Sequence, residues 1–348
     1  MDNGQCTRVL QGYAVSLLDV DWSPDGGRLV SAGSNSLVSI WDADAGAAPV
    51  ELRGHQWIVQ GVAWTPASQI VASCGWDNSI RLWDTTTKTP DQILSDADDP
   101  IYFFCVAWSA DGQRLAAGTY MHGVLVWEVG AQRRHWVGDQ LRTWIRCVAW
   151  SPDGARLVGG GDDGRLFMWD AATGSLMREL TGHQGVITSV AWHGDGRQVA
   201  SGGGGRAGGE LFVWDAQSSE RVRAVSGLES DVSAVAWDQT GNVLVTGGND
   251  GTLRWWDVQS GQGVRTYSGH RGTIRALKMS PDGTRVASCG DDGAIMLWNL
   301  DTGEHVRTLR RDRPYERLDI TGIHGLTEAQ LATLRALGAI EKAGLSTP

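Results

Sequence analysis

The chain has 348 residues, of which 41% are apolar, and this is enough for one large domain with a buried core. Its formal net charge of −10 argues against nucleic acid as a partner, because phosphate binding needs a basic surface. No apolar run approaches the roughly 18 residues of a membrane span. Residues 1–5 also lack the basic and apolar stretches of a secretory signal, so we expect a cytoplasmic protein without a membrane partner.

The first expected element is an outer β-strand at residues 5–10. A unit that ends in tryptophan followed by Asp, Glu or Asn then recurs seven times, with steps of 42 to 45 residues. This period is typical of a β-propeller with four strands per blade, so the sequence predicts an all-β, seven-bladed propeller over residues 1–310. The repeated tryptophans are Trp41, Trp83, Trp127, Trp169, Trp214, Trp256 and Trp298.

The second unit shows how a blade is encoded. Ile58–Trp64 reads as the inner strand, Ile70–Ser73 as the second and Ser79–Trp83 as the third, and an outer strand ends near Leu94. Gly, Pro, Asn and Asp separate these short strands, as hairpins require. A large residue ends each inner strand, and we interpret this set as packing between blades: Trp22, Trp64, Trp108, Trp150, Trp192, Trp237 and Met279.

With these motifs in register, residues 5–309 resemble the WD40-repeat family. The resemblance implies a hydrogen-bonded set of His, Ser or Thr, Asp and Trp within a blade, which is a sound way to satisfy a buried carboxylate. Two blades match it fully, with His55, Ser73, Asp77 and Trp83 in blade 2 and His270, Ser288, Asp292 and Trp298 in blade 7. The other five depart from it, through Tyr13 and Asn35 in blade 1, Met121 in blade 3, Asp139 and Gly159 in blade 4, the glycine-rich run 202–209 in blade 5 and Leu228 in blade 6.

Catalytic motifs are absent from the sequence. The Ser/His/Asp sets lie inside the blade framework and lack the G-x-S-x-G elbow of a hydrolase. There is no nucleotide-binding P-loop, and the run 202–209 reads as a flexible hairpin tip, not a phosphate cradle. We therefore expect no catalytic residues, no metal and no cofactor. The five cysteines fit no zinc spacing and are interpreted as reduced, buried thiols: Cys6, Cys74, Cys105, Cys147 and Cys289.

The two ends of the repeat region offer one outer strand too many. Residues 5–10 and residues 304–309 both have the pattern of the outer strand that would complete the last blade. A short hairpin connects residues 304–309 to the preceding strand, so the entropy of loop closure favours them. The family resemblance gives a precedent for the N-terminal strand, and both alternatives stay open at this stage.

Residues 311–348 form a C-terminal extension outside the repeats. Thr327 and Gln330 make a capping box, and leucines at helical spacing follow, so we expect one short amphipathic helix at about 327–337 that docks on the propeller. The tail resembles the C-terminal ends of bacterial signalling proteins, which carry WD40 repeats behind a STAND or NACHT-like NTPase, a kinase, a protease or a TIR module. This implies that the chain is the sensor end of a larger protein.

Five tryptophans lie outside the two repeated positions. Trp136 and Trp255 take strand positions and are interpreted as structural, whereas Trp57, Trp76 and Trp144 fall in loops that the family places on its top face. The residue four before each inner-strand Trp should line the mouth of the channel. Together these positions predict a binding surface over blades 2–4, edged by an acidic loop (Asp96, Asp98, Asp99) and made of Trp57, Gln60, Trp76, Tyr102, Phe104, Tyr120, Trp144 and Arg146, with Arg275 at the matching place in blade 7.

Three functions remain open from the sequence. The first is a non-enzymatic recognition or sensor propeller that binds a protein, a peptide or a small ligand, either as a monomer or as part of a larger chain. The second is a structural scaffold for a complex, with no single site. The third is a propeller enzyme with its site at the channel mouth. The exposed aromatic residues favour the first, because Trp, Tyr and Arg commonly anchor partners.

Overall fold

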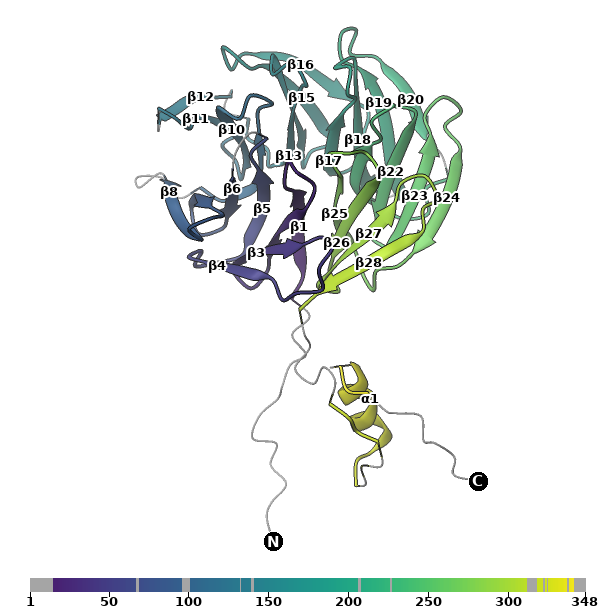
Figure 1. Ribbon diagram of the computed structural model, residues 1–348. Coiled ribbons are helices and arrows are strands. Elements are labelled where there is room, and N and C mark those ends of the chain that lie inside the picture. Colours follow the sequence, from purple (N-terminus) through teal and green to yellow (C-terminus); the bar gives the residue numbers. More distant parts are fainter. Residues whose placement is uncertain are drawn as a thin grey trace. The chain divides into compact units, whose positions relative to one another are not determined.

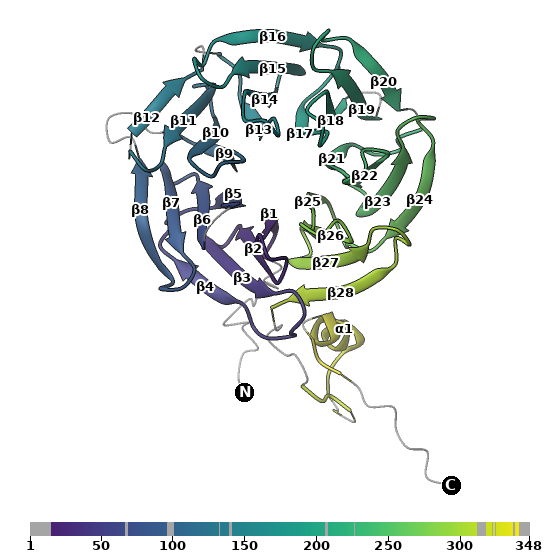
Figure 2. The same cartoon turned by 45° about the horizontal axis from the view of Figure 1, so that its top comes forward.

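The computed structural model describes residues 15–66, 69–95, 101–131, 133–138, 141–205, 208–225, 227–311, 318–321, 323, 325–336 and 338–340. The described chain falls into two compact units, one of residues 15–309 and the other containing the described residues from 310 onward. The first unit is a ring of seven four-stranded antiparallel sheets around a central channel (Figures 1 and 2). This confirms the predicted seven-bladed propeller.

Each blade is a meander in which sequence neighbours pair. Blade 1 contains β1 (Leu17–Trp22), β2 (Arg28–Gly33), β3 (Leu37–Asp42) and β4 (Val50–Arg53). Blade 2 contains β5 (Val59–Trp64), β6 (Ile70–Gly75), β7 (Ser79–Asp84) and β8 (Thr89–Ser95). Blade 3 contains β9 (Phe103–Trp108), β10 (Arg114–Thr119), β11 (Val124–Glu128) and β12 (Arg133–Val137). Blade 4 contains β13 (Ile145–Trp150), β14 (Arg156–Gly161), β15 (Arg165–Asp170) and β16 (Leu176–Thr181).

The remaining blades repeat this order. Blade 5 contains β17 (Ile187–Trp192), β18 (Gln198–Gly205), β19 (Gly208–Asp215) and β20 (Arg221–Val225). Blade 6 contains β21 (Val232–Trp237), β22 (Val243–Gly248), β23 (Thr252–Asp257) and β24 (Gly263–Ser268). Blade 7 contains β25 (Ile274–Met279), β26 (Arg285–Gly290), β27 (Ala294–Asn299) and β28 (His305–Arg310). The first strand of each blade lines the channel and the fourth forms the rim (Figure 2).

The tryptophans that end the inner strands join each blade to the one before it. The indole N–H of Trp150 donates to the carbonyl of Ala107 at 2.9 Å, and that of Trp192 donates to Ala149 at 3.0 Å. An arginine at the start of the preceding blade's second strand often stacks on the same ring, as Arg114 does on Trp150, with 4.7 Å from its guanidinium carbon to the ring centroid. The predicted packing role of these tryptophans is confirmed.

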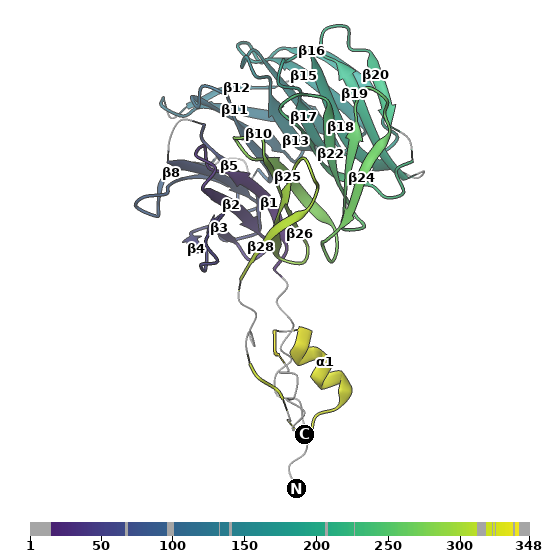
Figure 3. The same ribbon diagram turned by 45° about the vertical axis from the view of Figure 1, so that its right-hand side comes forward.

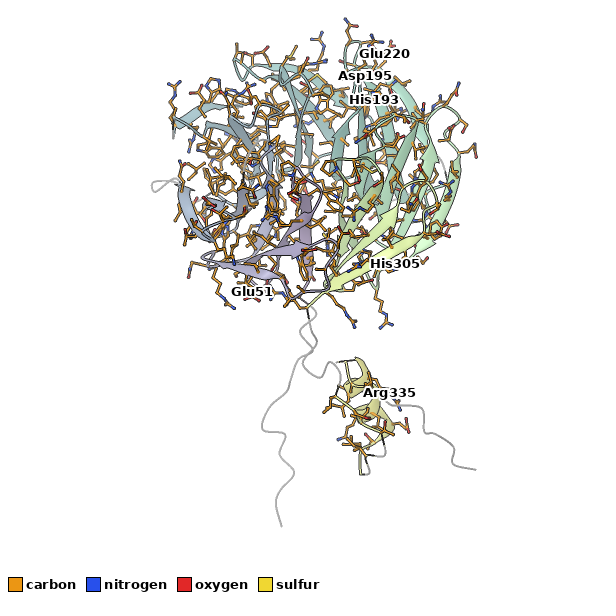
Figure 4. The ribbon with its side chains drawn as sticks, viewed as in Figure 1. Glu51, His193, Asp195, Glu220, His305 and Arg335 are labelled. Carbon is orange, nitrogen blue, oxygen red and sulfur yellow. The ribbon has the colours of Figure 1, made fainter. Side chains whose placement is uncertain are left out.

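Serine and aspartate close the turn after the inner strand in several blades. In blade 1 the Ser23 hydroxyl donates to Asp25 and accepts the N–H of Arg28 at 2.9 Å. Blade 5 has His193 in the serine position, with its Nδ1 2.6 Å from the Asp195 carboxylate. Figure 4 labels both side chains, which lie next to each other at this turn. In blade 6 the two residues are exchanged, since Asp238 takes the serine position and accepts from Thr240 and from the N–H of Val243, so the turn accommodates more than one polar pair.

Residues 305–310 occupy the outer position of the last blade, as the fourth strand of its sheet, β28. The short hairpin is therefore the alternative that closes this blade, and residues 5–10 lie outside the described part of the chain. Blade 1 takes its strands from residues 17–53 and blade 7 from residues 274–310, so no described strand is shared across the seam between them. Side chains must hold this seam.

The hydrogen-bonded sets of blades 2 and 7 form as predicted. In blade 2, Trp83 donates to the Ser73 hydroxyl at 2.8 Å, and that hydroxyl lies 2.7 Å from His55 Nε2. His55 Nδ1 lies 2.9 Å from Asp77. Because a carboxylate can only accept, Nδ1 carries the proton and Nε2 accepts from the serine. Burial acts to raise the pKa of Asp77, but the hydrogen bonds that its carboxylate accepts from His55, from the N–H of Gln56 and from Ser79 outweigh it and hold that pKa at about 2.

Blade 5 also has a complete set, contrary to the expectation that only blades 2 and 7 keep one. Glu210 supplies the carboxylate, with its Oε2 3.0 Å from Nδ1 of His183. Nε2 of His183 lies 2.7 Å from the Ser201 hydroxyl, which accepts the indole N–H of Trp214 at 2.8 Å. Burial lowers the pKa of His183 more than Glu210 raises it. The longer glutamate reaches the histidine from a later position in the chain than the usual aspartate.

The glycine run beside Glu210 is strand and not a flexible tip. The strands β18 and β19 continue the ladder to Gly204↔Gly209 and Gly205↔Gly208 and lie side by side (Figure 3). Glycine is required by close approach, because a Cβ on Gly204 would come within 2.1 Å of the Asp231 side chain. Residues 206 and 207 at the tip are outside the described residues.

The second unit contains the helix α1 (Glu328–Ala336), close to the predicted bounds. Its capping box forms, since Gln330 Oε1 accepts the N–H of Thr327 at 2.8 Å and the Thr327 hydroxyl accepts the N–H of Gln330 at 3.3 Å. Gly338 follows with φ +107°, a conformation suited to a helix stop. In the part of the chain that the structure describes, no helix is long and apolar enough to cross a membrane.

Candidate recognition site at the channel mouth

A β-bulge interrupts every inner strand at the same place. In blade 4, Ile145 and Cys147 pair with consecutive residues of β14, and Arg146 between them has no partner in the ladder. A bulge of this kind turns one side chain out of the alternating pattern, and bulges are frequent next to functional sites. The seven bulge positions are those predicted to line the mouth, namely Leu18, Gln60, Phe104, Arg146, Thr188, Ser233 and Arg275.

Two further residues of each blade lie beside the bulge. The N–H at the start of the turn between the second and third strands donates to a carbonyl two residues before the bulge. Tyr120 donates to Tyr102 at 2.9 Å in blade 3, and Asp162 donates to Trp144 at 2.9 Å in blade 4. Three side chains per blade are therefore brought to the mouth by one backbone pattern, and their identity sets the chemistry of each sector.

The mouth of blades 3 and 4 contains a connected group of aromatic rings, which we call the aromatic cluster (Tyr102, Phe104, Tyr120 and Trp144). Ring centroids lie 6.1 Å apart for Tyr102 and Tyr120, 4.8 Å for Tyr120 and Trp144, and 5.9 Å for Phe104 and Trp144. Tyr102 and Tyr120 remain 41% and 39% exposed, and the other two rings are half-buried. These four rings therefore lie together, and their role in binding stays a prediction.

Arg146 completes the cluster. Its guanidinium carbon lies 4.7 Å from the centroids of both Phe104 and Trp144, within the range of a cation–π contact. Its Nε donates to Asp162 at 2.8 Å, and Nη2 lies 2.8 Å from the same carboxylate oxygen. The guanidinium is thus held in place by two rings and one carboxylate. The pairing with Asp162 was not among the sequence predictions.

The other predicted mouth residues do not join the aromatic cluster. Trp57 is 58% exposed on blade 2, and Trp76 is half-buried there, with an indole N–H that has no acceptor in the described structure. Gln60 is half-buried in the same blade, and Arg275 lies on blade 7, bidentate to Asp291 at 2.8 and 3.0 Å. The acidic loop Asp96, Asp98 and Asp99 is outside the described residues. Met121, which sequence reasoning used only as a missing aspartate, is an exposed neighbour of Tyr120.

Blades 5 and 6 use their mouth hydroxyls to join blades. The Thr188 hydroxyl lies 2.6 Å from the carbonyl of Val232 in the next blade and 3.1 Å from that of Gly202. The Ser233 hydroxyl contacts the carbonyls of Gly247 and Ile274 in the same way. A hydroxyl has a single proton to donate, and here it is committed within the ring. In blades 3 and 4, by contrast, the mouth side chains are not all used in contacts that join one blade to the next.

Three charged residues lie among the inner strands of blades 7, 1 and 2. Asp19 accepts the N–H of Val62 at 3.0 Å, and Asp21 accepts that of Trp64 at 2.8 Å. Burial raises the pKa of Asp19 to about 6, against the opposing charge of Lys278, and it also raises the pKa of Asp21. Burial acts to lower the pKa of Lys278, but the charges of Asp21 and Asp19 outweigh it and raise that pKa.

We expect Asp19 to make the folded protein less stable as pH rises from about 4 to about 7. Its pKa is higher in the folded chain than in the unfolded chain, so the folded state holds a proton that the unfolded state has already lost. The free energy of unfolding should fall by about 1–3 kcal/mol across this window, as measured by urea unfolding at a series of pH values.

Asp19→Asn should flatten this dependence, to which Asp21 adds in the same direction, while His183, whose pKa is lowered in the folded chain, acts against it in the upper part of the window. Carboxylates whose pKa is lowered, such as Asp77, change the stability with the opposite sign and at lower pH, so they contribute little between pH 4 and pH 7. Identical pH profiles for Asp19→Asn and the unmodified chain would contradict the assignment.

The described cysteines agree with the sequence interpretation. Cys74, Cys105, Cys147 and Cys289 are free thiols, and burial raises the pKa of each. Cys74 and Cys289 are fully buried, whereas Cys105 and Cys147 are partly so. Cys6 lies outside the described residues. Within the ranges that the structure describes, no group of three or more His, Cys, Asp or Glu side chains is placed to hold a metal ion.

Seven four-stranded blades, a bulge in every inner strand and His–Ser–Trp sets define a repeat propeller. Comparison with known families agrees, because the model of the WD domain, G-beta repeat family matches residues 4–42, 48–84, 133–170, 174–215, 219–257 and 261–299. These six segments cover more than half of the chain, which therefore belongs to the WD40 family. The unmatched stretch between residues 84 and 133 contains the first three strands of blade 3, the blade that contributes most of the aromatic cluster.

One stretch of the chain is also similar to a longer plant protein. It is 39% identical over 64 residues to the chromatin assembly factor 1 subunit FAS2 homolog of Oryza sativa subsp. japonica. The match covers 18% of this chain and 13% of that protein. The chain thus spans a small fraction of this relative's length. The likeness is therefore limited to one short stretch and says nothing further about this chain.

Proposed function

We propose that this chain is a non-enzymatic recognition propeller that binds a segment of a partner protein at the channel mouth of blades 2–4. WD40 propellers generally serve as protein-interaction or scaffold modules, which gives the class of function. The aromatic cluster gives its place on this chain. Trp57 and Trp76 extend the same surface over blade 2, next to blade 3 in the ring.

The single observation that carries the proposal is the exposure of packed aromatic rings around a fixed arginine. Large apolar side chains are costly to leave in water, and exposed aromatic patches commonly mark partner surfaces. Tyr, Trp and Arg also dominate the residues whose loss most weakens protein interfaces. The rings here are held by one another, so little side-chain entropy remains to be lost on binding.

We further propose that the propeller is the sensor end of a bacterial signalling protein. What supports this is the tail, whose segment from Arg313 to Gln330 resembles the ends of WD40-containing STAND or NACHT-like proteins. In such a protein the partner segment would bind at the mouth, and the effector module would belong to the larger polypeptide. The chain itself then acts in the cytoplasm without chemistry of its own, as a monomer or as part of that polypeptide.

Trp144→Ala and Trp76→Ala should each weaken partner binding by more than about 1 kcal/mol, with Trp144 the larger effect because it sits in the aromatic cluster. The partner is first captured from the host lysate on the full chain, identified and purified. Its affinity for each variant is then measured by calorimetry, and circular dichroism during heating establishes that the variants are folded.

Val264→Ala provides the control. Val264 is an apolar residue of the rim that is 52% exposed and lies away from the mouth, so its replacement removes apolar surface without touching the proposed site. A structural scaffold without a single site predicts that the mouth and rim variants behave alike. Unchanged affinity in the Trp76→Ala/Trp144→Ala double variant would refute the proposed site.

A further inference from the structure

We propose that the mouth between blades 3 and 4 binds a carboxylate side chain, Asp or Glu, of the partner segment, and that Arg146 receives it. This inference rests on the proposed function and specifies the chemistry of the partner. It is carried by the orientation of one guanidinium group, the rings around it and the contrast with the matching pair on blade 7.

Arg146 has one edge in use and one edge free. Its Nε and Nη2 face Asp162, while Nη1 has no acceptor in the part of the chain that the structure describes. The side chain is 33% exposed, so the free edge is open to solvent. The Nη1–Nη2 edge of a guanidinium matches a carboxylate with two parallel hydrogen bonds, a short and strong geometry.

The aromatic cluster prepares this edge for binding. Phe104 and Trp144 both lie 4.7 Å from the guanidinium carbon, which limits its rotation and removes water from its faces. A charge-assisted hydrogen bond is stronger where the local dielectric is low. The hydroxyls of Tyr102 and Tyr120 make no hydrogen bond within the described structure, so they are further donors close to the same place.

A cationic side chain fits this site less well than a carboxylate does, although Asp162 keeps one oxygen, Oδ2, that Arg146 does not use. The ring faces of Phe104 and Trp144 that could attract a cation are already covered by Arg146. A lysine or arginine of the partner would also meet the positive charge of that guanidinium at close range. Asp162 lowers the net charge of the group, but it leaves donors and no free acceptor on the outward edge of Arg146.

Blade 7 provides a built-in comparison. Arg275 and Asp291 are separated by 16 residues, as are Arg146 and Asp162, and they form the same kind of ion pair at the mouth. No aromatic ring lies within cation–π distance of Arg275 among the described residues. The arginine–aspartate pair is therefore common to blades 4 and 7, and the aromatic frame is what distinguishes blade 4.

The test uses random dodecapeptides displayed on phage and selected on the full chain. Selected peptides should be enriched in Asp or Glu, and replacing that residue by Gln or Asn should weaken binding by roughly tenfold or more. Arg146→Gln should weaken the parent peptide to the same extent, with no further loss when both changes are combined. Arg275→Gln should leave the affinity unchanged.

The outcomes separate this inference from the proposed function. Peptides that need Trp144 but are basic or neutral, or that bind Arg146→Gln as well as the unmodified chain, would overturn the carboxylate site and leave the aromatic surface standing. Peptides that bind Trp144→Ala equally well, or no selected peptide at all, would count against both. Arg146→Lys keeps the charge and removes the fork, so an intermediate affinity in this variant excludes misfolding as the cause.

Discussion

Replacing Trp22 by alanine should lower the free energy of unfolding by about 3–5 kcal/mol, the usual cost of removing a buried tryptophan. Trp22 is 4% exposed at the seam between blades 7 and 1. Its indole N–H donates to the carbonyl of Lys278 at 3.1 Å, and Arg285 stacks on the ring at 5.1 Å. Arg285 also pairs with Asp44 at 3.1 Å, so one ring organises several contacts across the seam.

The seam makes this loss larger than the same loss elsewhere. Trp237 has the same position in blade 6 and the same kind of bond, to the carbonyl of Ala191 at 3.0 Å. The polypeptide backbone connects blade 5 directly to blade 6. Among the described residues, blades 7 and 1 are joined only by non-covalent contacts. Trp237→Ala should therefore cost less than Trp22→Ala in urea unfolding. An equal or smaller cost at Trp22 would show that the seam is no weaker than the other junctions.

Glu210→Ala should lower the free energy of unfolding by about 1–3 kcal/mol, because it orphans buried donors. The carboxylate accepts from His183 and from the N–H of Gln184 at 3.0 Å, and both would lose their partner. The same cost is expected for Asp77→Ala in blade 2 and Asp292→Ala in blade 7. Thermal and urea unfolding of the three variants would measure it.

Asp163→Ala is the matched control. Asp163 occupies the aspartate position of blade 4, but among the described residues its partners are the side chain and the N–H of Arg165, at the surface of the ring. An exposed pair of this kind contributes about 1 kcal/mol or less. Amide hydrogen exchange should also show blade 3, which lacks the set, opening before blades 2, 5 and 7. A Glu210 variant as stable as the unmodified chain would remove blade 5 from this group.

The architecture could be predicted from the sequence because the same pattern of strands and turns recurs seven times. A spacing of 42 to 45 residues, turn residues at fixed places and one tryptophan in each third strand leave little freedom in where strands begin and end. The capping box at Thr327 was equally local, and the helix that follows it begins one residue later. Patterns within a few residues of one another could be interpreted without knowledge of the fold.

What the sequence did not predict depends on contacts between distant residues. Glu210 replaces an aspartate only because β18 and β19 extend far enough to bring its carboxylate to His183. Trp136 was interpreted only as a structural strand residue, and its indole N–H donates to the carbonyl of Ala171 in blade 4, a contact that its place in the sequence did not indicate. The pairing of Arg146 with Asp162 likewise requires two strands to be aligned across a bulge.

The candidate site was predicted in outline and corrected in extent. Counting four residues back from each inner-strand tryptophan located the mouth, since the bulge falls at the same place in every blade. The rings of Tyr102, Phe104, Tyr120 and Trp144 do meet, but Trp57 and Trp76 stand apart from them on blade 2. Which rings touch depends on side-chain directions, and spacing along the chain does not contain that information.

The bulge has a consequence for how such a molecule can change. A residue that has left the alternation of its strand lies outside the regular packing on the two faces of the blade. Five of the seven bulge residues, all but the hydroxyl residues Thr188 and Ser233 that join blades, can therefore be exchanged while the tryptophan ladder and the His–Ser–Trp sets stay as they are. A library randomised at those five positions alone would vary what the ring recognises at little cost to its stability, and the same separation lets natural selection retune a partner without rebuilding the fold.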